Sequence, residues 1–181
     1  MDGALSDCEG ADLVEEYLNR KILETNRCVM MPFQKTDYDE VKQLYMNQEV
    51  RRYLGGVRKE EELPLIFDEM CHTRDENHWV VRNKDTNGLV GVISLGPHHD
   101  GSFHEISYQL LPEWWGNGYG LEAVRTILDY AFDVLHLPKV IAETQIANLP
   151  SRKLLEKAGM REEQRLIRFG AEQVIYTMAK Q

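Results

Sequence analysis

The chain has 181 residues, of which 43% are hydrophobic and 28% are charged, the composition of one ordinary globular domain. Its formal net charge of -9 disfavours binding to nucleic acid or to an anionic membrane surface. No apolar run approaches the roughly 20 residues of a membrane span, and the acidic start is unlike a signal peptide, so we expect a cytoplasmic protein.

The sequence gives little reason to expect a disulfide or a metal. Cys8, Cys28 and Cys71 are widely spaced and contain no C-x-x-C pair, so they indicate neither a disulfide framework nor a zinc site. The run His98-His99-Asp100 carries ligand types, but adjacent imidazoles rarely converge on one ion. We therefore expect no metal.

The first predicted element is an amphipathic helix between Ala11 and Leu23, where apolar residues recur at helical spacing. We expect residues 1–22 to be a helical extension and residues 23–181 to be a single domain. The sequence does not choose between an extension that packs on this domain and one that forms a contact in a homodimer.

The next part of the chain predicts a strand, two helices and a hairpin. Residues 28–33 are short and apolar, and Thr36 or Asp37 then caps a helix that carries Val41, Leu44 and Tyr45. A second helix runs from about residue 60 to residue 71. Two β-rich runs, 79–82 and 89–95, are joined by Asp85-Thr86-Asn87-Gly88, which predicts a hairpin because Asn-Gly readily takes positive φ.

The remaining elements alternate between strands and helices. A strand at 104–111 is followed by a helix with a broad apolar stripe from Leu121 to Leu135, and a strand at 139–144 by a helix at 148–158 that Gly159 ends. Strands at about 163–169 and 173–178 close the chain as a hairpin. The fold class is α/β (α+β), with a mixed, mostly antiparallel central sheet of about seven strands flanked by helices.

Three glycines, Gly116, Gly118 and Gly120, lie between the strand at 104–111 and the next helix. Glycines let the backbone approach a ligand closely, and the helix start aims unpaired N–H groups and a positive dipole end at an anion. This suits a pyrophosphate. The order G-x-G-x-G fits neither the Walker loop nor the dinucleotide fingerprint.

The same stretch carries a family resemblance. It resembles the acyl-CoA pyrophosphate loop of the GNAT N-acetyltransferases, in particular the RimJ/RimL-like branch that acetylates N-terminal amines of ribosomal proteins, in the run Trp114-Trp115-Gly116-Asn117-Gly118-Tyr119-Gly120-Leu121-Glu122-Ala123. Three further segments match in the same order: residues 23–27, residues 49–56, and Asn148-Leu149-Pro150-Ser151 followed by residues 154–160. The resemblance therefore covers roughly residues 22 to 180.

The resemblance implies acetyl-CoA as co-substrate. In the family, backbone N–H groups around residues 117–121 hold the CoA pyrophosphate, and the pantetheine arm lies between the two parallel strands, here 105–111 and 139–144. The implied CoA-binding residues are Leu110, Leu111, Trp115, Gly116, Asn117, Gly118, Tyr119, Gly120, Leu121, Asn148 and Ser151.

Glu105 is the candidate general base, because it occupies the strand position where many of these enzymes carry a glutamate that acts through water. Strand alternation places Glu105, Ser107 and Gln109 on one face, which is compatible with a polar row facing a cleft. The alternative is a solvated strand carboxylate with no catalytic role.

Ser151 is the candidate proton donor to the CoA thiolate, and Asn148 the candidate contact to the pantetheine. Both positions also suit a helix N-terminus, and the two roles can coexist. The tyrosine that many superfamily members place four residues after this serine is Leu155 here. Protonation would then fall to Ser151, to another hydroxyl such as Tyr119, or to water.

The acceptor is expected to be an amine, more often a protein N-terminus than a lysine. At pH 7 an α-amine of pKa near 8 is uncharged about a tenth of the time, but a lysine only about one part in two thousand. A small amine such as a polyamine or an aminoglycoside-like compound is the first alternative, and a non-catalytic acyl-CoA-binding module is the second. Residues 51–53, 96–101 and 168–170 resemble acceptor-side segments of the family but name no substrate.

Overall fold

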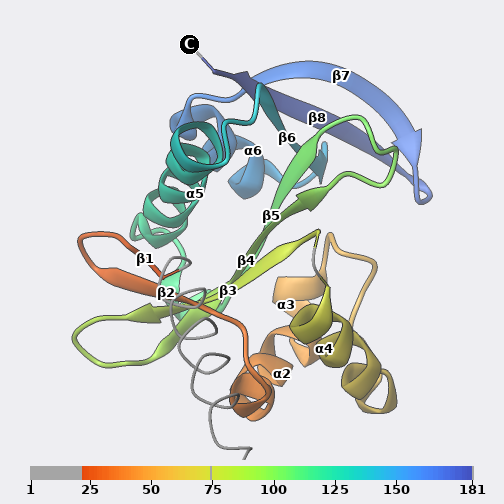
Figure 1. Cartoon of the computed structure of the whole chain (residues 1–181). Helices are drawn as coiled ribbons and strands as arrows, with labels where there is room; N and C mark the ends of the chain where they lie inside the picture. Colours follow the sequence, from red (N-terminus) through yellow and green to blue (C-terminus); the bar gives the residue numbers. More distant parts are fainter. Residues whose placement is uncertain (1–21, 74, 181) are drawn as a thin grey trace, which may run out of the picture.

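The computed structural model describes residues 22–73 and 75–180, which form one eight-stranded sheet with helices on both faces (Figure 1). The strand order is β1-β2-β3-β4-β5-β6-β8-β7. The strands are β1 (Leu23–Glu24), β2 (Cys28–Pro32), β3 (Asn77–Asn83), β4 (Leu89–Pro97), β5 (His104–Leu110), β6 (Lys139–Gln145), β7 (Arg161–Arg168) and β8 (Ala171–Ala179). The described helices are α2 (Tyr38–Met46), α3 (Gln48–Arg51), α4 (Leu63–His72), α5 (Tyr119–Asp129) and α6 (Leu149–Ala158).

The alternation of apolar side chains along the strands builds a separate hydrophobic cluster on each face of the sheet. On β3, Trp79 and Val81 belong to the cluster that includes buried residues of α5 and α6, whereas Val80 between them belongs to the cluster formed with α2 and α4. Figure 1 shows these two helix groups on opposite sides of the strands. Helices therefore cover both faces of the sheet.

The parallel pair β5 and β6 is the exception in an otherwise antiparallel sheet, and its ladder is short. It pairs His104 with Val140 and Glu105 with Ile141. Beyond this point β5 continues to Leu110 paired with β4, and β6 continues to Gln145 paired with β8. The two strands therefore diverge in the middle of the sheet.

The predicted fold class is confirmed, with small differences in its elements. The sheet has eight strands rather than about seven because Leu23–Glu24 pairs with β2 as a strand of its own. The hairpin between β3 and β4 forms as predicted, with Asn87 at φ 58°. Asp37 is the N-cap residue of α2 but makes no capping bond from its side chain, because a 3₁₀ turn, Lys35–Asp37, precedes the helix.

The predicted N-terminal helix lies outside the described residues as far as residue 21. Leu23, the first residue of the predicted domain, pairs with Met30 in the sheet. The second predicted helix begins at Leu63 rather than near residue 60, since Glu60–Glu62 form a separate 3₁₀ turn. No helix in the described part of the chain is both long and apolar enough to cross a bilayer.

Candidate active site

A cavity of about 610 Å³ opens where β5 and β6 diverge. Its walls come from both strands, from the segment after α3, from the turn before α5 and from the start of α6. Residues far apart in sequence therefore meet at one site, which lies in the gap left by the short parallel ladder.

The turn before α5 has the backbone conformation that its glycines predict. Gly116 and Gly118 have φ of 76° and 85°, and Gly118 is the N-cap of α5. A side chain at Gly120 would lie 2.7 Å from Leu154 Cδ1 and 2.8 Å from Leu110 Cδ1. The glycines thus allow a sharp entry into the helix and a close packing of its first turn against α6 and β5. The first N–H groups of α5 have no partner inside the helix and can bind an anion.

Arg27, next to the start of β2, fixes this turn from the side. Its guanidinium donates to the Asn117 carbonyl over 2.9 Å and forms a 2.6 Å ion pair with Glu122 in the first turn of α5. It also lies over the Tyr119 ring, 4.1 Å from the centroid. Thr25 donates a further 2.9 Å hydrogen bond to Glu122. These contacts hold the glycine turn without filling the cavity.

Two lysines on α6 add positive charge to the cavity wall. Lys153 and Lys157 are one helical turn apart and both line the cavity. Cationic side chains of this kind suit the phosphates of a CoA molecule. Sequence analysis missed them, although their spacing of four residues on a predicted helix places them on one face.

Ser151 meets a hydroxyl that sequence analysis also missed. Its Oγ lies 2.8 Å from the Oη of Tyr108, and its N–H donates to Asn148 Oδ1 over 3.3 Å. Burial raises the pKa of Tyr108 to about 12, so its phenol stays protonated at neutral pH. The alternative donor Tyr119 is held elsewhere, since its hydroxyl accepts from Asn83 and its ring packs against Trp114.

Glu105 lies at the point where the parallel ladder ends. Its Oε1 accepts the backbone N–H of Glu143 over 3.3 Å, in place of a further rung of the ladder. Burial raises the pKa of Glu105, which would make it a stronger base than an ordinary carboxylate. It is not among the residues that line the cavity, so it would need a water molecule to reach a substrate there.

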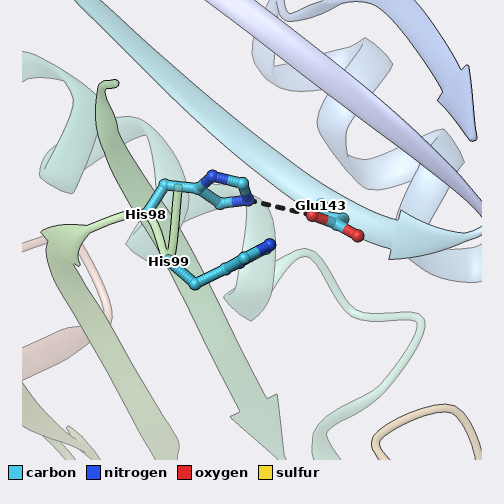
Figure 2. Close-up of side chains that lie close together, drawn as sticks. All are labelled: His98, His99 and Glu143. Atoms are coloured by element: carbon cyan, nitrogen blue, oxygen red, sulfur yellow. Dashed lines mark hydrogen bonds and ion pairs between the residues drawn. The ribbon is translucent and has the colours of Figure 1, made fainter. Parts of the chain in front are cut away.

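Glu143 does line the cavity and belongs to a charged cluster (Figure 2). Its Oε2 lies 2.9 Å from His98 Nε2 and 2.9 Å from the guanidinium of Arg168. His98 is buried, and its Nδ1 lies 2.8 Å from Asp100 Oδ1. Burial lowers the pKa of His98, but the hydrogen bonds to Asp100 and Glu143 outweigh it, so the pKa is raised.

The cluster also brings His99 beside His98. The ring centroids are 3.9 Å apart, and ligand atoms of His98, His99 and Glu143 lie within 4.8 Å of one another. Arg168, a cation of the chain itself, contacts both His99 and Glu143. The absence of a metal stays a prediction.

The far wall of the cavity comes from the segment after α3. Arg52 and Tyr53 line it, together with Glu49 of α3 itself. Arg51 instead turns inward, is 6% exposed, and donates to Gln109 on β5 over 3.1 Å. Arg51 therefore anchors this segment to the sheet rather than contacting a ligand.

Most of the predicted CoA-binding residues converge on this cavity. Among its lining residues are Leu110, Trp115, Gly116, Gly118, Gly120, Leu121, Asn148 and Ser151. The other three lie beside it. Leu111 packs in the core with Val80 and Val92, Asn117 accepts from Arg27, and Tyr119 packs beneath that guanidinium.

A mixed sheet whose parallel strands diverge around a cavity, with a helix start at its edge that can bind an anion, is the arrangement expected of an acyl-CoA-dependent transferase. The family model described as "Acetyltransferase (GNAT) domain" matches residues 27–161, and the chain belongs to that family. It is an N-acetyltransferase that uses acetyl-CoA.

Relatives in sequence and structure agree with this assignment. The chain is 29% identical over 150 residues to the uncharacterized N-acetyltransferase YoaA of Bacillus subtilis, covering 78% of this chain and 84% of that one. It is 28% identical over 133 residues to a spermidine N(1)-acetyltransferase of Escherichia coli, covering 72% and 70%. A GNAT-family acetyltransferase structure from Bacillus anthracis superposes with a TM-score of 0.78 at 25% identity, covering 87% of this chain and 98% of that one.

Proposed function

We propose that this enzyme transfers the acetyl group directly from acetyl-CoA to the α-amine of a protein or peptide N-terminus, as in the RimJ/RimL-like branch. The observation that carries the proposal is the mixed charge of the acceptor side of the cavity. Glu49 and Glu143 line it together with Arg52. A peptide offers an amine to the carboxylates and carbonyl oxygens to the guanidinium, whereas a polyamine offers only cations.

Direct transfer is favoured by the residues that line the cavity. A covalent enzyme intermediate would need an activated nucleophile such as a cysteine thiolate. The described cysteines, Cys28 and Cys71, do not line the cavity, and burial raises the pKa of both thiols. Acetyl-CoA and acceptor would therefore react in a ternary complex.

The catalytic roles follow from the hydroxyl pair and the carboxylates. Ser151, hydrogen-bonded to Tyr108, would protonate the departing CoA thiolate. Glu105 would act as base through water, as its sequence position predicts. No metal takes part in this scheme. A cytoplasmic location and a homodimer also remain predictions.

A polyamine acceptor is the second candidate, because two relatives are named after the polyamine spermidine. The spermidine N(1)-acetyltransferases of Escherichia coli and Vibrio cholerae are each 28% identical to this chain, over 133 and 109 residues. Arg52 at the cavity wall argues against it, since a second cation beside the guanidinium would be repelled.

The test is a release assay for free CoA thiol with three acceptor panels. The first holds short peptides with free N-termini, the second the same peptides N-terminally blocked but with a lysine, and the third spermidine, spermine and aminoglycosides. Release confined to the first panel supports the proposal, and release confined to the third selects the polyamine. Binding of acetyl-CoA without release in any panel would favour a non-catalytic acyl-CoA-binding module.

A further inference from the structure

The two carboxylate oxygens of Glu143 have different surroundings. Among the described residues, Oε2 has both partners of the side chain, His98 Nε2 and the Arg168 guanidinium. Oε1 is buried and has no hydrogen-bond partner among the described residues. The side chain as a whole is 7% exposed, and Figure 2 shows its second oxygen turned away from both imidazoles.

A buried carboxylate oxygen without a donor is unfavourable, because it has lost its water and gained nothing in return. Glu143 lines the cavity in which the two substrates would meet. We propose that Glu143 Oε1 binds the acceptor as its ammonium ion and takes the first proton from it. This inference rests on the proposed function, which it deepens by naming the group that receives the amine.

Glu105 is less suited to this contact. Its Oε1 is already engaged with the Glu143 N–H, and the residue does not line the cavity. Its role in this arrangement is to hold the backbone of Glu143 at the point where β5 and β6 separate. This inference therefore replaces the role of water-mediated base proposed above for Glu105, which becomes a positioning residue for Glu143.

His98 orients the Glu143 carboxylate from the other side. As an imidazolium it can donate from Nδ1 to Asp100 and from Nε2 to Glu143 Oε2, which leaves Oε1 for the substrate. The charged and titratable groups around His98 are Asp100 on its own loop, Glu105 on β5, Glu143 on β6, Arg168 at the end of β7, and the neighbouring His99. Every element that meets here thus contributes to the charge at Glu143.

The protons balance in this scheme. The ammonium gives one proton to Glu143 and the neutral amine attacks the thioester carbon. The C–S bond breaks as the amide forms, and the second N–H proton leaves the nitrogen. The sulfur takes a proton from Ser151, which the second N–H proton replaces, and Glu143 returns its proton to solvent.

The test compares Glu143→Gln with Glu105→Gln and with the exposed control Glu61→Gln, using an N-terminal peptide and acetyl-CoA. We expect Glu143→Gln to lower kcat/KM for the peptide by about 100-fold or more at pH 7, with the dependence on acetyl-CoA unchanged. The difference in kcat/KM between the wild type and Glu143→Gln should become smaller as the pH rises above the pKa of the peptide amine, since a free amine no longer needs to be deprotonated first. A purely structural role for Glu143 would not produce this narrowing.

Calorimetric titration of the same peptide in the presence of CoA separates the two proposals. Peptide binding by the wild type that Glu143→Gln abolishes, without turnover by either protein, would support the site and overturn the proposed function. Turnover by Glu143→Gln within about threefold of the wild type at pH 7 would overturn the inference and leave the proposed function standing. Failure of the wild type to bind any amine would also overturn it.

If Glu143→Gln does not fold, His98→Asn carries the test. This variant removes the imidazole donor to Glu143 Oε2 and leaves that of Arg168, so it should lower kcat and shift the pH profile, while acetyl-CoA still raises the melting temperature. An unchanged pH profile would overturn the inference.

Discussion

The hydroxyl oxygens of Tyr108 and Ser151 lie 2.8 Å apart, although the residues are 43 positions apart in the chain. The pair joins the middle of β5 to the first turn of α6, on the cavity wall where Leu155 replaces the tyrosine expected of the superfamily. Tyr108 thus places a phenol beside Ser151 from the sheet rather than from the helix.

We predict that Ser151→Ala lowers kcat by about 10- to 1,000-fold and that Tyr108→Phe has a smaller effect in the same direction. The reason is that Ser151 would protonate the thiolate, while Tyr108 orients the Ser151 hydroxyl. Because the two residues act as a unit, the double variant should be little worse than Ser151→Ala. Multiplicative effects in steady-state kinetics at saturating substrates would show instead that the hydroxyls act independently.

Acetyl-CoA binding should depend on Gly118 but not on an equivalent glycine elsewhere. Gly118 and Gly101 both have positive φ, 85° and 73°, so alanine strains the backbone at both. At Gly118 the added Cβ would also lie 3.2 Å from the Arg27 guanidinium, whereas at Gly101 it meets nothing within 4 Å. Only Gly118→Ala should weaken acetyl-CoA binding.

The measurement is a thermal melt with and without acetyl-CoA. A ligand at about a hundred times its dissociation constant stabilises the fold by roughly 2.7 kcal/mol, or about 5 to 11 °C for a chain of this length. We expect this rise for the wild type and for Gly101→Ala, and a smaller one for Gly118→Ala. Equal rises in all three would show that the glycine turn does not hold the pyrophosphate.

Arg27→Met should raise the KM for acetyl-CoA several-fold with little change in kcat. The substitution removes the hydrogen bond to the Asn117 carbonyl and the ion pair with Glu122, so the turn before α5 loses its lateral support. The chemistry itself does not involve Arg27. Lys84→Met, which breaks only the surface pair with Glu24, is the matched control. A fall in kcat alone would contradict this assignment.

Stability should fall with rising pH through the titration of His98. Its pKa is raised above the usual 6.5, so the folded state holds the proton more tightly than the unfolded state. The resulting stabilisation is complete below about pH 6 and is lost as the pH rises through the pKa of the folded state. Urea unfolding from pH 6 to pH 9 should therefore show that the free energy of unfolding falls more steeply for the wild type than for His98→Gln.

A control variant separates this effect from a general loss of stability at alkaline pH. His72→Gln on the surface of α4 should follow the wild type. Parallel stability curves for the wild type and His98→Gln would mean that the contacts of His98 with Asp100 and Glu143 do not retain its proton.

Features that depend on local backbone chemistry could be predicted from the sequence. The glycines predict the turn in which Gly116 and Gly118 take positive φ, and the N-cap at Asn148 and the C-cap at Gly159 follow from residue types at helix ends. Strand alternation also placed Glu105 on the polar face of β5. Applied to β6, the same alternation would have placed Glu143 on the corresponding face of the neighbouring strand.

Which of these side chains meet depends on the packing of the whole fold and could not be predicted from the sequence. Strand alternation predicts the face of the sheet on which a side chain lies, but not which side chain of the adjacent strand lies next to it. That neighbour depends on the register of β5 against β6 and on where their ladder ends. Glu105 lies at that end and bonds the Glu143 backbone, so Glu143 rather than Glu105 lines the cavity. Two further contacts join segments that are distant in the sequence: the 2.8 Å contact of Tyr108 with Ser151 and the ion pair of Arg27 with Glu122. Only the packing of the folded chain brings such segments together.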